Sequence, residues 1–411
     1  MLQWRPAVLA QRHAVARSSR LRRYSQPHRL PPSRIAPSLR YNRPTTKNVY
    51  RAALNVRSLS LLAALPPILV PPVVLVGLTI TLWLYKCAMM IIFQNKIIYM
   101  PSMPPFSRQE KIVDYEQVCG PITWEEGRIK SLDGVEIAIC VGRNLAQAVD
   151  EKETKVRKGE VVILYFQGLV SFISSLSDER VNNRWCRNGS SIPPRLPQLS
   201  AVLKALDDRT YTLVAVSYRG YWTSRGRASQ RGIERDAIAA LNWVRQTYTD
   251  PNTHIVLWGQ SIGAGVATFL AASDHQQQRS SIQPESQGRP PSLILETPFV
   301  SVPSMLLALY PQRWLPYRYL GPFLRNWWDS EAAIRAMSMT GTKTTEKRKV
   351  LVISADKDEL VPPEQADVLE KLSVDCGMDV SRTRVRGALH TEATFRGDGR
   401  NAVVAFLTQV E

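Results

Sequence analysis

The chain has 411 residues, of which 44% are hydrophobic and 21% charged, so a full-sized core can form and a wholly disordered protein is excluded. Its formal net charge of +18 is concentrated at one end. Residues 1–109 hold sixteen Lys or Arg and no acid, which leaves +2 for residues 110–411. The later part therefore lacks the basic surface that a nucleic acid requires, and we expect no nucleic-acid partner.

Residues 1–57 form a basic leader with twelve Arg and no Asp or Glu. This composition is typical of a mitochondrial transit peptide, and Arg22-Arg23-Tyr24-Ser25 resembles a matrix-processing cleavage site. A basic tail lying on an anionic membrane surface is the alternative. We interpret 1–57 as a targeting leader.

An apolar segment follows at 58–95. A helix over residues 73–93 would span about 31 Å, enough to cross the hydrocarbon core of a bilayer. The Pro66-Pro67 and Pro71-Pro72 pairs should keep the preceding part from forming a regular helix. A buried core helix is the alternative. Because the positive charge precedes the span, we predict a single-pass anchor that carries the rest of the chain across the membrane.

From about residue 122 onward, apolar runs alternate with helical patterns, which predicts one α/β domain with a mostly parallel sheet over 110–411. Helices are expected at 229–247, 262–270, 365–372 and 391–409. Polar loops are expected at 171–196 and 276–291. Eight strands are expected, at 122–130, 135–142, 161–166, 212–217, 253–258, 292–296, 349–354 and 381–385.

The segment Gly259-Gln260-Ser261-Ile262-Gly263 matches the Gly-x-Ser-x-Gly turn that exposes a nucleophilic serine between a strand and a helix. Such an enzyme needs an acid and then a histidine later in the chain. His390, which follows the last expected strand, is the only such histidine with an acid-bearing strand before it, because His275 lies soon after the serine. The acid is Asp358 or Asp356, both near the end of one strand.

Several segments resemble the α/β-hydrolase superfamily, in particular its single-pass branch related to bud-emergence proteins, which includes lysophospholipases and acyl-protein depalmitoylating enzymes. The resemblance covers about residues 92–411. It rests on the serine turn and on Phe93-Gln-Asn-Lys-Ile-Ile-Tyr-Met-Pro101, Tyr218-Arg-Gly-Tyr-Trp-Thr-Ser-Arg-Gly226 and Asp358-Glu-Leu-Val-Pro362. It implies an α/β-hydrolase fold, with an eight-stranded sheet flanked by helices after one transmembrane helix, and it favours Asp358 as the acid.

Two departures from the family pattern concern the site. Trp222 stands where the family has glycine, and Gln167-Gly168-Leu169 replaces the usual His-Gly-Asn. Because an oxyanion hole uses backbone N–H groups, the donors can survive this change, and we assign them to Leu169 and Ile262. The alternative is that Gln167-Gly168 only forms a turn at the end of a strand.

The sequence thus predicts a membrane-anchored serine hydrolase of ester or thioester bonds with Ser261, His390 and Asp358 as its triad. The aromatic segment 299–348 resembles a cap over the site and would suit a lipid or acyl-protein substrate. A catalytically inactive interaction protein is the alternative. No cofactor and no metal are expected, because nucleotide motifs and metal-ligand spacing are lacking and the five cysteines form no Cys-x-x-Cys pair.

Location in the cell follows from the leader. We expect the mitochondrial inner membrane, with the domain in the intermembrane space. The endoplasmic reticulum, with the domain in the lumen, is the alternative, because Asn188-Gly-Ser190 is a glycosylation sequon.

Overall fold

The computed structural model describes residues 66–101, 106–144, 159–168, 189–280, 289–338 and 347–410. The chain divides into two compact units, residues 1–71 and 72–411. The leader at 1–57 and the site residue Leu169 both lie outside the described residues, as do Cys186 and Asn188.

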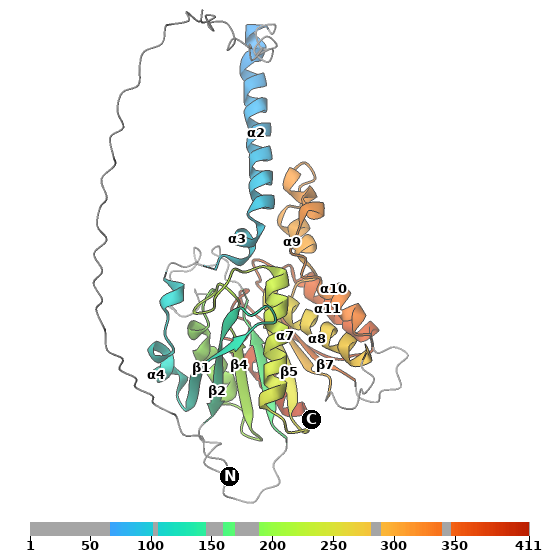
Figure 1. Cartoon of the computed structure of the whole chain (residues 1–411). Coiled ribbons are helices and arrows are strands. Elements are labelled where there is room, and N and C mark those ends of the chain that lie inside the picture. Colours follow the sequence, from blue (N-terminus) through green and yellow to red (C-terminus); the bar gives the residue numbers. More distant parts are fainter. Residues whose placement is uncertain are drawn as a thin grey trace, which may run out of the picture. The chain divides into compact units, whose positions relative to one another are not determined.

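The second unit is built on one eight-stranded sheet (Figure 1). Its order is β1-β2-β4-β3-β5-β6-β7-β8. The β1–β2 and β2–β4 pairs are antiparallel, and every other pair is parallel. The strands are β1 (Ile122–Lys130), β2 (Glu136–Asn144), β3 (Val161–Phe166), β4 (Tyr211–Val216), β5 (His254–Gln260), β6 (Ser292–Glu296), β7 (Lys349–Ala355) and β8 (Asp379–Val385). The mostly parallel sheet predicted from the sequence is confirmed.

The central strands are apolar on both faces because helices cover both faces. Every residue of β3, β4 and β6 is buried, as parallel strands between two helical layers require. On one face the core includes residues of α7 (Gln230–Thr247), α8 (Ile262–Ser280), α10 (Ser330–Ala336) and α11 (Pro363–Asp375). On the other face it includes residues of α4 (Glu116–Cys119), α6 (Leu196–Leu203) and α12 (Gly397–Gln409).

Shorter elements connect or precede these layers. The segment between β6 and β7 contains α9 (Val302–Leu309), η9 (Pro316–Tyr319), η10 (Gly321–Phe323) and α10. The remaining elements are η1 (Pro67–Leu69), α3 (Gln94–Tyr99), η2 (Ser107–Gln109), η3 (Ile112–Tyr115) and η7 (Pro193–Arg195).

Some element boundaries differ from those expected. Helix α8 continues to Ser280, through residues predicted to be a loop, and α12 begins at Gly397 after a series of turns rather than at residue 391. The start of α12 passes close to the preceding turns, and glycine at position 399 permits this approach. A Cβ there would lie 2.0 Å from the Ala393 carbonyl oxygen. The α6 helix lies partly in the expected polar loop, most of which falls outside the described residues.

The apolar segment forms α2 (Val70–Ile92), in which no residue is buried. Among the described residues, Pro67–Ile92 is the one helical stretch long and apolar enough to cross a membrane. The expectation that Pro71-Pro72 would precede the helix was wrong. Both prolines lie in the first turn of α2, where a missing N–H costs no intrahelical hydrogen bond.

Candidate active site

Ser261 occupies a strained turn between β5 and α8. Its φ of +53° lies in the left-handed region that side chains other than glycine rarely adopt. The Ser261 N–H donates to the Glu296 carbonyl at the end of β6 (2.8 Å), which ties the turn to the neighbouring strand. Backbone strain of this kind concentrates at functional sites, where the surrounding structure holds it in place.

The two glycines of the motif are required by close backbone contacts. A Cβ on Gly259 would lie 2.1 Å from the Gly263 carbonyl oxygen, and a Cβ on Gly263 would lie 2.1 Å from the carbonyl oxygen of Phe166 on β3. Both distances are far below van der Waals contact. Because the start of α8 passes directly over the end of β3, only glycine fits at these positions.

His390 reaches Ser261 from the loop after β8. Its Nε2 lies 2.8 Å from Ser261 Oγ, and the imidazole is almost completely buried. Its backbone N–H donates to Glu359 Oε2 at 3.0 Å. These contacts fix both the backbone and the ring of a residue that is distant from the serine in the chain.

Asp358 lies on the other side of the imidazole. Its Oδ2 is 2.8 Å from His390 Nδ1, while its Oδ1 accepts the N–H groups of Leu360 and Val361 at 3.0 and 2.8 Å. The alternative acid, Asp356, is exposed, and within the described residues it accepts only a long hydrogen bond from Gly387 N–H (3.4 Å). The Ser261, His390 and Asp358 side chains are therefore connected in one hydrogen-bonded row, and Asp356 lies outside it.

Of the two expected oxyanion donors, Ile262 lies among the described residues and Leu169 does not. Ile262 is the first residue of α8, so its N–H belongs to the first turn of a helix, where backbone donors have no partner within the helix. Leu169 lies outside the described residues. The adjacent Gly168 does approach the serine, because a Cβ there would be 3.1 Å from Ser261 Cβ. Gln167 is completely buried, and its side-chain amide has no hydrogen-bond partner among the residues that the structure describes.

A buried carboxylate that the sequence analysis missed connects the serine turn with the histidine loop. Glu296 Oε2 accepts from Trp258 Nε1 (3.0 Å), and its Oε1 accepts from Gln260 Nε2 (3.1 Å) and Thr394 Oγ1 (2.7 Å). Burial raises the pKa of Glu296, and the hydrogen bonds from Thr394 and Trp258 oppose this shift. The available signal was an acid directly after the apolar run Leu293-Ile-Leu295 of the strand Ser292–Glu296.

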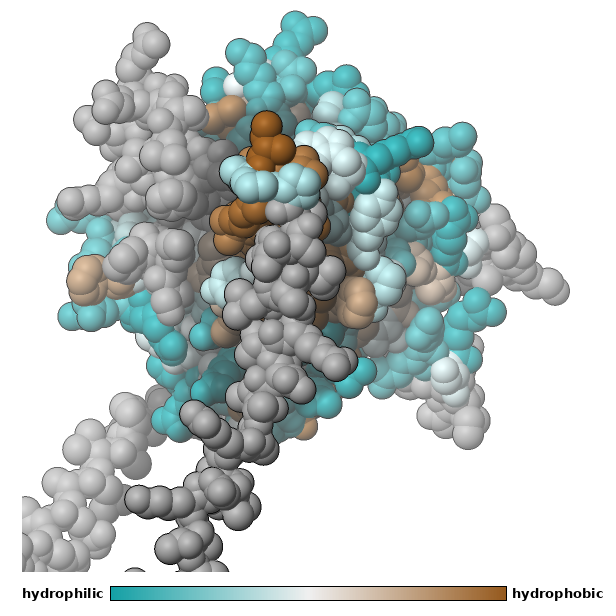
Figure 2. Space-filling model, turned by 90° about the horizontal axis from the view of Figure 1, so that it is seen from above, coloured by the Kyte–Doolittle hydropathy of each residue, from teal (hydrophilic) through white to brown (hydrophobic). Residues whose placement is uncertain are grey.

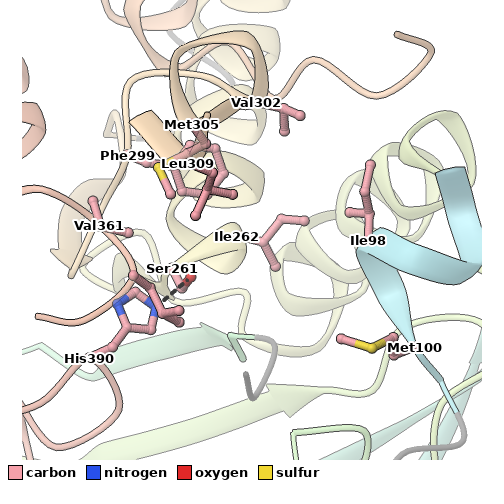
Figure 3. Close-up of a pocket in the computed structure, with 11 residues that line it drawn as sticks. Ile98, Met100, Ser261, Ile262, Phe299, Val302, Met305, Leu309, Val361 and His390 are labelled. Atoms are coloured by element: carbon pink, nitrogen blue, oxygen red, sulfur yellow. Dashed lines mark hydrogen bonds between the residues drawn. The ribbon is translucent and has the colours of Figure 1, made fainter. Parts of the chain in front are cut away.

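A pocket of about 250 Å³ opens beside Ser261 and His390. Figure 3 shows Phe299, Met305 and Leu309 on one side of it and Ile98 on the other. Apart from Ser261 and His390, every lining side chain is apolar. Within the described residues, no group of three His, Cys, Asp or Glu side chains is placed to hold a metal ion.

The segment between β6 and β7 contributes Phe299 and the α9 residues Val302, Met305 and Leu309 to this pocket, whereas the aromatic residues that follow α9 do not line it. Trp328 and Tyr317 are buried, whereas Trp314, Tyr319, Phe323 and Trp327 are exposed. None of these six lines the pocket. The exposed aromatic residues therefore need an explanation other than contact with the reacting groups.

An eight-stranded sheet of this order, with a serine in a strained turn after β5 and a carboxylate and a histidine after later strands, defines the α/β-hydrolase fold. Comparison with known proteins agrees, although no family model matches the chain. The "Alpha/beta hydrolase domain-containing protein WAV2" of Arabidopsis thaliana is 26% identical over 67% of this chain and 74% of that protein. "Protein bem46" of Schizosaccharomyces pombe is 30% identical over 53% of this chain and 63% of that protein.

A third relative is "Lysophosphatidylserine lipase ABHD12" of Danio rerio, 32% identical over 39% of this chain and 38% of that protein. The chain is therefore a bud-emergence-type relative in the α/β-hydrolase superfamily. It spans less than two thirds of the length of the bem46 and ABHD12 proteins. Among solved structures, an alpha-beta hydrolase from Vibrio vulnificus has a TM-score of 0.49 at 15% identity, covering 77% of this chain and 91% of that chain.

Proposed function

We propose that the chain is a membrane-anchored serine hydrolase that cleaves carboxylic ester or thioester bonds. The observation that carries this proposal is the row of hydrogen bonds from Ser261 Oγ through His390 to Asp358, with 2.8 Å at each step. An alcohol, an imidazole and a carboxylate in this order are the parts of a serine nucleophile activated by a general base.

In the proposed reaction, His390 Nε2 takes the Ser261 proton as Oγ attacks the substrate carbonyl carbon. Asp358 holds the Nδ1–H tautomer and stabilises the imidazolium that forms. The N–H groups of Ile262 and Leu169 stabilise the oxyanion. His390 then donates the proton to the departing alcohol or thiol, which leaves an acyl group on Ser261. Water, deprotonated by His390, releases that group as a carboxylic acid.

The apolar pocket supports a substrate with a hydrocarbon acyl group. In the described part of the chain, its lining offers no charged partner other than the reacting imidazole, and a cavity of this character favours apolar ligand parts. A relative is named a lysophosphatidylserine lipase. We therefore propose a lipid or an acylated protein as substrate. Helix α2 would hold the hydrolase domain beside the membrane where such substrates lie.

Replacement of the nucleophile tests the assignment. Ser261→Ala removes the only atom that can form the acyl-enzyme, so we expect no labelling by a fluorophosphonate probe and a loss of more than about 10⁴-fold in ester hydrolysis. Asp356→Asn, which alters an exposed acid outside the hydrogen-bonded row, is the matched control and should retain labelling. Normal labelling of Ser261→Ala would refute the assignment, and an unlabelled wild type would favour the inactive interaction protein.

We further propose the mitochondrial inner membrane as the location, with the domain in the intermembrane space. The basic, acid-free leader supports this proposal. The lumen of the endoplasmic reticulum is the competing location, supported by the sequon at Asn188.

A further inference from the structure

An apolar face is exposed on the segment from α9 to the loop after η10. We call it the cap face and define it by Leu307, Leu309, Trp314, Tyr319, Phe323 and Trp327, whose exposed fractions range from 45% to 67%. Figure 2 views the molecule from above, from the side that carries α2, and hydrophobic residues gather near the centre of this view. The cap face is established by its exposed fractions, because Trp and Tyr are pale on the hydropathy scale of the figure. Large exposed apolar areas of this kind mark an interaction surface.

The cap face contacts the helix that is apolar enough to cross a membrane. The rings of Trp314 and Trp83 lie 5.8 Å apart, and Lys86 Nζ lies 4.4 Å from the centre of the Tyr317 ring. Trp83 precedes the last residue of α2, Ile92, by nine residues, which corresponds to about 14 Å along a helix. If α2 crosses the bilayer, Trp314 must therefore lie at the depth of the membrane as well.

Hydrogen bonds at the base of the cap fix this arrangement. Gln94 Nε2 donates to the Phe323 carbonyl (2.6 Å), and Arg325 N–H donates to Gln94 Oε1 (2.8 Å). Arg325 Nη2 also donates to the carbonyls of Ile91 and Ile92 at the end of α2 (2.7 and 3.1 Å). The guanidinium thus satisfies backbone acceptors at a helix end, where the helix has no partners of its own. The cap cannot move away from α2 without breaking these bonds.

The pocket lies between the two elements that this arrangement joins. Val302, Met305 and Leu309 line it from α9, and Ile98 lines it from α3, which directly follows α2. Figure 3 shows Val302 and Ile98 on either side of the pocket, with Ser261 below them. An acyl chain lying in the bilayer beside α2 and α9 would therefore be next to the entrance of the pocket.

We propose that the cap face inserts into the leaflet nearest the hydrolase domain and forms a lateral entrance through which a lipid acyl chain passes from the bilayer to Ser261. The occupant of the cap face is lipid, because its contact with Trp83 places it at a depth where water is excluded. Trp and Tyr side chains are favoured at the boundary between the hydrocarbon core and water, which the part of the cap nearest the domain would occupy. The insertion of the cap rests on the proposed membrane anchor, and the entrance rests in addition on the proposed hydrolase activity.

Chemical labelling tests the insertion alone. The full chain would be reconstituted in phosphatidylcholine vesicles as Leu307→Cys or as Val368→Cys, a control on α11 with a matching exposed fraction (45% and 47%). A membrane-impermeant maleimide, read by peptide mass spectrometry, should modify Leu307→Cys at least about tenfold more slowly than Val368→Cys. Both should react equally in sodium dodecyl sulfate. Equal modification rates of the two variants in vesicles would overturn the proposal. Protection of Leu307→Cys that disappears when the protein is diluted in lipid would also overturn it, because a second copy of the chain would then cover the cap face.

Substrate preference tests the entrance. Leu307→Glu places a charge on the cap face without changing a pocket residue, and Val368→Glu is the matched control. For Leu307→Glu we expect hydrolysis of a long-chain lysophospholipid in vesicles to fall at least about tenfold, while hydrolysis of soluble p-nitrophenyl butyrate stays within about twofold. Equal effects on both substrates, or none on either, would overturn lateral entry. A wild type inactive on both would refute the hydrolase function and leave the labelling result valid.

Discussion

Ser261 illustrates how single residues build the candidate site. Its left-handed backbone costs about 1–3 kcal/mol, which the surrounding contacts must offset. Those contacts are the hydrogen bond from Ser261 N–H to the Glu296 carbonyl and the close approach of Gly263 to β3. The glycines are thus explained by atoms on neighbouring strands, and the motif is a consequence of packing as much as of chemistry.

Substitution of Gly263 tests this explanation. Gly263→Ala would force the start of α8 away from the Phe166 carbonyl, because the new Cβ would lie 2.1 Å from that oxygen. We expect a displaced Ser261 and a loss of about 100-fold or more in fluorophosphonate labelling rate. Gly397→Ala, where a Cβ meets nothing within 4 Å, is the control and should label normally. Unchanged labelling of Gly263→Ala would show that the turn tolerates the shift.

At the scale of elements, the loop after β4 is held by an arginine cluster rather than by contact with Ser261. Arg219 pairs with the buried Asp236 of α7 (2.7 Å) and with Asp133 in the turn between β1 and β2 (2.8 Å), and it also donates to Ser131. The family motif in residues 218–226 therefore serves mainly to hold three elements together: the loop after β4, helix α7 and the turn between β1 and β2. Removal of one partner from a buried ion pair lowers the free energy of unfolding by about 3–5 kcal/mol. The residues of this cluster are therefore needed for the stability of the fold.

Trp222, which departs from the family pattern, has a structural role in the same loop. Its φ of +39° explains why glycine suits this position. The indole is buried, and its Nε1 donates to the Glu110 carbonyl (2.7 Å), while Arg108 Nε donates to the Trp222 carbonyl (2.9 Å). The tryptophan thus ties the segment before β1 to the loop, and it gives no support to the inactive alternative.

The arginine cluster predicts how stability changes in acid. The hydrogen bond from Arg219 holds the pKa of Asp133 well below its ordinary value of about 4. A lowered folded-state pKa stabilises the fold above the unfolded pKa, and that stabilisation is lost as the pH falls below it. We expect the Tm difference between wild type and Asp133→Asn in detergent to be constant above about pH 5 and to shrink below about pH 4.

The matched control for this measurement is Asp207→Asn, an exposed acid outside the cluster. Its Tm should follow that of the wild type across the same range. A Tm difference for Asp133→Asn that does not depend on pH would mean that the carboxylate contributes by packing alone.

At the scale of the whole molecule, the described parts join an apolar helix, a pocket and a row of reacting groups. Helix α2 leads into α3, whose Ile98 lines the pocket. Tyr99 continues the connection, since its hydroxyl donates to Asn326 Oδ1 and accepts from Trp328 Nε1 (2.9 Å each). The family segment that begins at Phe93 is therefore the joint between the helix and the cap. Such a joint suits an enzyme whose substrate is supplied by the membrane.

Glycosylation distinguishes the two proposed locations. If the domain faces the intermembrane space, Asn188 meets no glycosylation machinery, and peptide-N-glycosidase should leave the mass of the chain unchanged. Deletion of residues 2–57 should also abolish import into isolated mitochondria. A mass decrease upon glycosidase treatment, absent from Asn188→Gln, would place the domain in the lumen of the endoplasmic reticulum.

The sequence by itself determined the strands and the site candidates. Residues 161–166 and 292–296 match β3 and β6 residue for residue, because a strand buried on both faces must be almost wholly apolar. Ser261 and His390 could be selected because histidines are few and the order of the three residues is restrictive, and the family resemblance favoured Asp358 over Asp356.

Only the tertiary structure decided the contacts between distant segments. The hydrogen bonds that distinguish Asp358 from Asp356 depend on a turn that directs one carboxylate to His390. The bridging role of Glu296 and the contact of Trp314 with Trp83 join residues that no local pattern relates. Periodicity reports which face of an element is buried, whereas the partner of a buried or exposed side chain is set by how whole elements pack.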